Sequence, residues 1–166
     1  MIAPAVYGSE LLSNGSFEAD LTGWTQVVGD GSVAYTSVSG EYYSGSGAVK
    51  LTAGATPASN PNVYQSFTVT AGKTYVIAVR TRGDGTNAGR YSVYDATNSA
   101  SIIATTTTAI SSTSYTLLTT SFVAPADCAT VQVVLYAPNL VLGAAYFDDV
   151  SVKEIVTPSI GNGGLS

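Results

Sequence analysis

Hydrophobic and polar residues alternate along most of this chain, as expected for strands that bury one face and expose the other. In the segment Thr74–Arg82, for example, Tyr75, Ile77 and Val79 are separated by smaller or polar residues. Val, Thr and Tyr, which favour β-strands, are frequent in these segments. The pattern predicts strands at Val33–Val38, Ala48–Ala53, Val63–Thr70, Thr74–Arg82, Arg90–Ala96, Tyr115–Ala124, Thr130–Ala137 and Ala145–Lys153, with a weaker candidate at Ile102–Thr108.

Short turn sequences such as Ser39-Gly40, Gly83-Asp84-Gly85 and Pro125-Ala126-Asp127 separate these strands. About nine or ten short strands without helical periodicity predict an all-β, two-sheet sandwich. The spacing alone is compatible with a jelly-roll or an immunoglobulin strand order. Since no internal linker is visible, we expect one domain at residues 10–154, an N-terminal arm at 1–9 and a flexible C-terminal tail at 155–166. Both end segments are candidates for ordering on a neighbouring subunit.

The composition argues against several classes of function. Charged residues make up 10% of the 166 residues, the net charge is −5, and six residues are basic. Nucleic acids and anionic membranes bind clustered Lys and Arg, so neither is an expected partner. The chain has no His, which removes the usual general base and the usual metal ligand. We therefore expect no enzymatic activity, and we expect the single cysteine, Cys128, to be a buried small hydrophobic residue.

Several motifs follow one another in the order found in a known family. They are Leu11-Leu12-Ser13-Asn14-Gly15-Ser16-Phe17-Glu18 with Leu21-Thr22-Gly23-Trp24, then Ser44-Gly45-Ser46-Gly47-Ala48-Val49-Lys50-Leu51, Val63-Tyr64-Gln65-Ser66-Phe67, and Ala145-Tyr146-Phe147-Asp148-Asp149-Val150. Together they resemble carbohydrate-binding modules of the families 4, 9 and 22 type over residues 10–154. The resemblance implies a jelly roll (a galactose-binding-domain-like fold) and a core position for Trp24. Such domains also recur in bacteriophage tail and capsid-surface proteins.

The resemblance also implies a structural Ca²⁺ where the first and last strands meet. Its ligands would be Glu18 and Asp148, with Glu41 as a less certain third and the carbonyl oxygen of Lys50 as a fourth. Carboxylate and carbonyl oxygens are the ligands that Ca²⁺ prefers. In the alternative interpretation, Glu18 and Asp148 accept backbone hydrogen bonds at strand ends.

A binding face can be predicted from the alternation in three strands, because successive side chains point to opposite faces. If Thr74–Arg82, Arg90–Ala96 and Thr130–Ala137 share one sheet, its outer face carries Arg80, Arg82, Arg90, Tyr94, Gln132 and Tyr136. Aromatic rings with Arg and Gln suit a glycan groove. They suit a protein interface equally well, and a solvated sheet face is a third interpretation.

The favoured function is a virion surface protein, either a capsid decoration or a tail-attached module, that binds host-surface glycans as a secondary activity. Its expected partners are a capsid or tail protein of the same particle, with a homo-oligomer in the assembly. The N-terminal sequence lacks a signal-peptide pattern, which favours a virion location over secretion. The alternative is a carbohydrate-binding module of a secreted polysaccharide-degrading enzyme, which would be extracellular.

Overall fold

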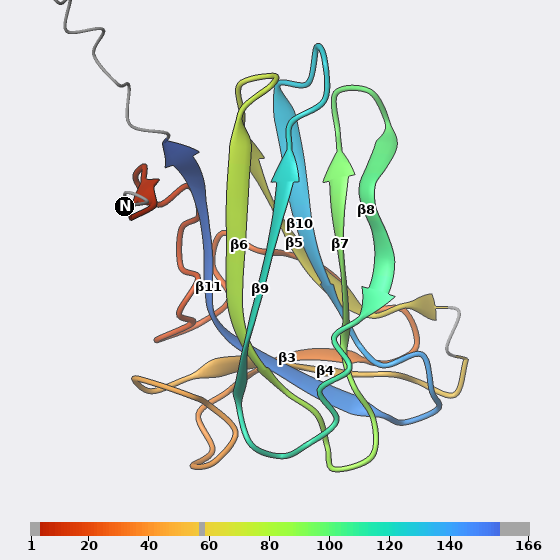
Figure 1. Ribbon diagram of the computed structural model, residues 1–166. Coiled ribbons are helices and arrows are strands. Elements are labelled where there is room, and N and C mark those ends of the chain that lie inside the picture. Colours follow the sequence, from red (N-terminus) through yellow and green to blue (C-terminus); the bar gives the residue numbers. More distant parts are fainter. Residues whose placement is uncertain (1–3, 57–58, 157–166) are drawn as a thin grey trace, which may run out of the picture.

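A computed structural model describes residues 4–56 and 59–156, and these residues form an all-β sandwich (Figure 1). None of the described residues belongs to a helix long and apolar enough to cross a membrane. The strands in this part of the chain are β1 (Val6–Tyr7), β2 (Thr25–Val27), β3 (Ser32–Thr36), β4 (Ala48–Thr52), β5 (Asn62–Thr68), β6 (Thr74–Arg82), β7 (Arg90–Asp95), β8 (Ala100–Thr107), β9 (Thr116–Val123), β10 (Thr130–Tyr136) and β11 (Ala144–Val156).

The strands form two antiparallel sheets. The first sheet has the order β3-β4-β11-β6-β9, with β1 paired to β11, and the second sheet has the order β2-β5-β10-β7-β8. Strands that follow one another in sequence, such as β6 and β7, often lie in different sheets. This arrangement confirms the predicted two-sheet sandwich, and it decides which side chains share a face.

The predicted strands are all present, and the weaker candidate at Ile102–Thr108 corresponds to β8. The structure adds β1 and β2, which have two and three residues, all of them exposed. Strands this short and this exposed have no alternation of hydrophobic and polar residues, so the pattern did not predict them. Residues Val6–Tyr7 of the predicted N-terminal arm therefore extend the first sheet by pairing with Ile155 and Val156. These two residues were predicted to begin the flexible tail at 155–166 but belong to β11, and the tail beyond Val156 lies outside the described residues.

The core lies between the sheets and is filled by the inward residues of both. Phe17, Phe147 and Leu51 are fully buried. Trp24 is 5% exposed, its ring centroid lies 5.3 Å from that of Phe17, and its indole N–H donates to the carbonyl oxygen of Asn14. These contacts confirm the prediction that Trp24 belongs to the core and is not a surface platform.

Cys128 is buried beside the start of β10, as predicted. Burial raises the pKa of its thiol to about 11, and the nearby carboxylate of Asp95 acts in the same direction. Because the thiolate is the reactive form, this environment keeps the side chain inert.

Candidate functional site

The six residues predicted to share a binding face lie on two different sheets. The prediction required β6, β7 and β10 to share one sheet, but β6 belongs to the first sheet and the other two belong to the second. The outward side chains Arg80 and Arg82 are therefore on the opposite side of the molecule from Arg90, Tyr94, Gln132 and Tyr136. The predicted grouping is wrong because alternation shows which way a side chain points, but not which strands pair.

Arg80 and Arg82 hold a loop on the outer face of the first sheet. The guanidinium carbon of Arg80 lies 4.4 Å from the centroid of the Tyr43 ring, and that of Arg82 lies 4.2 Å from the Tyr146 ring. Arg82 also donates a hydrogen bond to the carbonyl oxygen of Gly40. Cation–π contacts and hydrogen bonds of this kind fix the β3–β4 loop against β6 and β11.

The remaining four residues share the outer face of the second sheet. The strand register aligns Asn62, Tyr136 and Arg90 in one cross-strand row, and Ser66, Gln132 and Tyr94 in another. Between them lies a row of Tyr64, Val134 and Ser92. The strands β5, β10 and β7 are neighbours in the second sheet (Figure 1). We call the surface formed by their outward residues the tyrosine face.

The three tyrosines of this face occupy successive rows. Same-face residues on one strand are about 7 Å apart, so the rows of Tyr136, Tyr64 and Tyr94 span about 14 Å along the strands. All three side chains are partly exposed. Val134 is only 6% exposed despite its outward position, because it lies between Tyr64 on β5 and Tyr136 on its own strand.

Polar contacts fix one end of the tyrosine face. The Tyr136 hydroxyl lies 3.2 Å from Ser92 Oγ, and the guanidinium of Arg90 lies 5.4 Å from the centroid of the Tyr136 ring. Arg90 also donates to the carbonyl oxygen of Ala137 at 3.0 Å and to Asn60 Oδ1 at 2.9 Å. With these partners Arg90 orients the Tyr136 ring and has fewer donors left for a ligand.

Tyr64, Asn62 and Ser66 belong to the tyrosine face but were not among the predicted site residues. Alternation in the predicted strand Val63–Thr70 does place Tyr64 and Ser66 outward, opposite the buried Val63 and Phe67, while Asn62 lies one residue before that predicted strand and begins β5 in the structure. The missing information was that β5 pairs with β10 along its whole length.

The two predicted calcium ligands contact the same loop. Asp148 is fully buried, and its Oδ2 accepts hydrogen bonds from the backbone N–H of Tyr43 at 2.8 Å and of Ser44 at 3.1 Å. Glu18 Oε2 accepts from the N–H of Ser46 at 2.8 Å. Burial raises the pKa of Asp148 to about 6, against the opposing effect of these backbone hydrogen bonds. The geometry matches the alternative interpretation, in which both carboxylates accept backbone hydrogen bonds.

Glu41, the less certain third ligand, has other partners. Its Oε1 lies 3.2 Å from Lys50 Nζ and accepts from the Tyr146 hydroxyl at 3.3 Å. Within residues 4–56 and 59–156, no group of three or more His, Cys, Asp or Glu side chains is placed to hold a metal ion. Backbone carbonyl oxygens such as that of Lys50 are not among these groups, and calcium binding stays a prediction.

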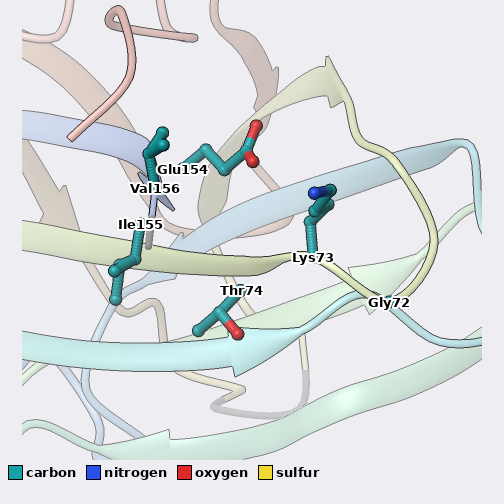
Figure 2. Close-up of a pocket in the computed structure, with 6 residues that line it drawn as sticks. All are labelled: Gly72, Lys73, Thr74, Glu154, Ile155 and Val156. Atoms are coloured by element: carbon teal, nitrogen blue, oxygen red, sulfur yellow. The ribbon is translucent and has the colours of Figure 1, made fainter. Parts of the chain in front are cut away.

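Two shallow pockets lie away from the tyrosine face. One, of about 230 Å³, is lined by Gly72, Lys73, Thr74, Glu154, Ile155 and Val156 (Figure 2). The other, of about 250 Å³, is lined by Tyr7, Val76, Ala78, Thr119, Ser151 and Lys153. Both involve strands of the first sheet, and neither contains a predicted ligand-binding residue.

Comparisons with known proteins place this fold in a class. The two-sheet sandwich is the jelly roll of carbohydrate-binding modules, as predicted. The sequence profile of the Carbohydrate binding domain family matches residues 9–140. The chain belongs to this family. A search of curated proteins finds no match.

Solved structures with the same fold have different roles. A xylan-binding domain from Paenibacillus barcinonensis is 18% identical, with 90% of this chain and 97% of that chain covered and a TM-score of 0.66. The enzymatically active domain of tailspike protein 4 from bacteriophage CBA120 is 15% identical with a TM-score of 0.66, covering 88% of this chain but 21% of that chain. A Stig cyclase from Fischerella sp. TAU is 16% identical, covers 91% and 98%, and has a TM-score of 0.69. At these identities the likeness concerns the fold alone.

Proposed function

We propose that this chain is a non-catalytic carbohydrate-binding module that binds a neutral glycan on the tyrosine face. The observation that carries the proposal is the presence of three partly exposed tyrosines in successive rows of one sheet face. Membership of the Carbohydrate binding domain family supports it.

The chemistry of the face suits a sugar chain. Tyrosine rings offer flat apolar surfaces on which the C–H groups of a sugar ring can stack, while their hydroxyls remain available for hydrogen bonds. Asn62 and Gln132 carry side-chain amides that both donate and accept, and Ser66 adds an exposed hydroxyl. Sugar hydroxyls also donate and accept, so these groups can pair with them in either sense.

The charge on the face favours a neutral glycan over an acidic one. In β5, β7 and β10 the charged residues are Arg90 and Asp95, and Asp95 is 1% exposed. Arg90 is already bonded to Ala137 and Asn60. An acidic polysaccharide would therefore find few free cationic donors here.

The same composition supports a binding role without catalysis. Glycoside hydrolysis needs a pair of carboxyl groups about 5 to 9.5 Å apart across the scissile bond. The tyrosine face presents no outward Asp or Glu from β5, β7 or β10. The fold is shared with a cyclase and with a tailspike domain described as enzymatically active. Every glycan that binds should therefore also be tested as a substrate, and we expect no product.

The test is binding to soluble neutral polysaccharides by affinity electrophoresis and calorimetry, with Tyr64→Ala and Tyr136→Ala as the variants. An aromatic contact is worth about 0.5–1.5 kcal/mol, so each variant should weaken binding by up to about 10-fold. Tyr43→Ala is the matched control, because Tyr43 is 45% exposed but lies against the first sheet. If both tyrosine-face variants bind with unchanged affinity and Tyr43→Ala binds more weakly, the glycan site lies on the other side of the molecule.

A virion location is the second part of the proposal. The support is that the same fold occurs within a bacteriophage tailspike protein, and that a glycan-binding face would suit contact with a host surface. Mass spectrometry and electron microscopy of purified particles from the source would test it, with the chain expected on a capsid or tail. Its absence from particles, together with a polysaccharide-degrading domain in the same protein, would favour the secreted alternative.

A further inference from the structure

The strand β9 is an uncovered edge of the first sheet. It pairs with β6 on one side, and no other described strand pairs with it on the other side (Figure 1). One row of its backbone N–H and C=O groups is therefore open to another strand. A free edge of this kind is a template for pairing with a second chain.

Natural proteins usually protect such edges with charged residues, proline or bulges. The sequence of β9, TLLTTSFV, contains no charge and no proline. Its register with β6 runs without a shift from Thr74↔Val123 to Thr81↔Thr116. The edge strand of the second sheet, β8, differs because its pairing with β7 has register shifts on both sides of Val93. Of the edge strands β8 and β9, β9 is therefore the one that pairs regularly and has no protecting bulge.

The charge distribution indicates what covers this edge. The chain has a net charge of −5, yet no residue from Ala96 to Ala126 is charged. Two copies of one acidic chain repel each other over most of their surfaces, but that repulsion is weakest where neither copy carries charge. Leu117 and Val123 are 48% and 56% exposed near the two ends of β9. An uncharged edge with exposed apolar side chains suits a second copy of this chain.

We propose that the protein forms a homodimer in which two β9 strands pair antiparallel about a twofold axis. The first sheet would then continue from one copy into the other through backbone hydrogen bonds. This contact is isologous, so it closes on itself and stops at two copies. It does not depend on the proposed glycan binding, because the tyrosine face belongs to the second sheet and stays free in both copies.

The length of the edge sets the expected strength. Eight residues of β9 span about 27 Å at about 3.4 Å per residue. An interface made by one strand edge falls at or below the low end of specific interfaces, about 1,200 Å² in total. We therefore expect a reversible dimer that dissociates on dilution, with two tyrosine faces that together bind a repetitive glycan more tightly than one.

Sedimentation velocity of the whole chain over a wide concentration range tests the proposal. The wild type should shift from monomer to dimer as concentration rises, and Ser121→Lys should stay monomeric. Ser121 is exposed on β9, so its replacement leaves the core unchanged. Ala104→Lys, at an exposed position of the other edge strand β8, is the matched control and should still dimerise. A wild type that is monomeric at all concentrations, or an S121K protein that dimerises normally, would overturn the proposal.

Hydrogen–deuterium exchange of the wild type gives a second readout that needs no variant. Backbone amides of β9 should exchange more slowly at high concentration than at low concentration, while those of β8 should not change. Equal exchange at both concentrations, or new protection in β8 instead of β9, would place the contact elsewhere and refute β9 pairing.

Discussion

The carboxylate of Asp84 fixes the connection by which the chain crosses from the first sheet to the second. Its Oδ1 accepts hydrogen bonds from the backbone N–H of Thr86 at 2.9 Å and of Asn87 at 2.7 Å. Its Oδ2 accepts from Asn87 Nδ2 at 2.8 Å and from the N–H of Ala144, the first residue of β11, at 3.0 Å. Asp84→Asn would replace one acceptor oxygen by an amide that faces N–H donors, so we expect it to destabilise the fold.

The size of the effect follows from the pKa of Asp84. Burial alone would raise this pKa, but the hydrogen bonds from Asn87, Ala144 and Thr86 lower it from 3.8 to about 2. At about 1.36 kcal/mol per pKa unit the stabilisation is at most about 2 kcal/mol, and solvent screening of a partly exposed group reduces it to about 1–2 kcal/mol. Since the folded pKa is the lower one, this stabilisation is complete above about pH 4 and is lost as the pH falls towards 2.

Urea unfolding followed by the fluorescence of Trp24, the chain's single tryptophan, measures this effect. We expect D84N to lower the free energy of unfolding by about 1–2 kcal/mol at pH 7 and by much less at pH 2. The control is Asp127→Asn, which removes an exposed carboxylate at the turn before β10. A D84N difference that is absent at pH 7, or that has the same size at both pH values, would refute the hydrogen-bonding argument.

Three further predictions concern other parts of the molecule. Because burial raises the pKa of Cys128 to about 11, an alkylating reagent at mildly alkaline pH should label it after unfolding but not before; rapid labelling of the native protein would contradict this. Gly15→Ala should cost about 1–3 kcal/mol in a denaturant titration, because the added Cβ would overlap a backbone carbonyl of β11; an unchanged midpoint would show that the two segments can separate. If Glu18 and Asp148 bind Ca²⁺, a chelator should lower the melting temperature in a thermal scan, whereas an unchanged melt would leave both as hydrogen-bond acceptors.

The strands were predictable because hydrophobic alternation is a local property. In β6, for example, every second side chain from Tyr75 to Thr81 is buried, as the sequence pattern indicates. Short strands such as β1 have no buried face and are held by pairing with β11, a contact between opposite ends of the chain. Local sequence contains no trace of that contact, so β1 could not be predicted in this way.

For the candidate site, the sequence pattern predicted which face of its strand each side chain occupies, but it did not predict which strands share a sheet. Tyr94, Gln132 and Tyr136 were placed correctly because β7 and β10 are neighbours. Arg80 was misplaced because the chain crosses between sheets after β6, and Tyr64 was missed because β5 joins β10 from far away in the sequence. Strand pairing depends on long-range packing, which single-strand patterns do not report.

The two sheets use the scarce charges of this chain differently. Lys50, Arg80 and Arg82 stack on aromatic rings against the first sheet, and Glu41 and Asp148 bond to groups in the same region. With charged residues at 10% of the chain, this concentration leaves the tyrosine face with Arg90 as its outward charge on β5, β7 and β10. The second sheet thus presents a nearly neutral, aromatic surface, which suits the proposed stacking on an uncharged sugar chain.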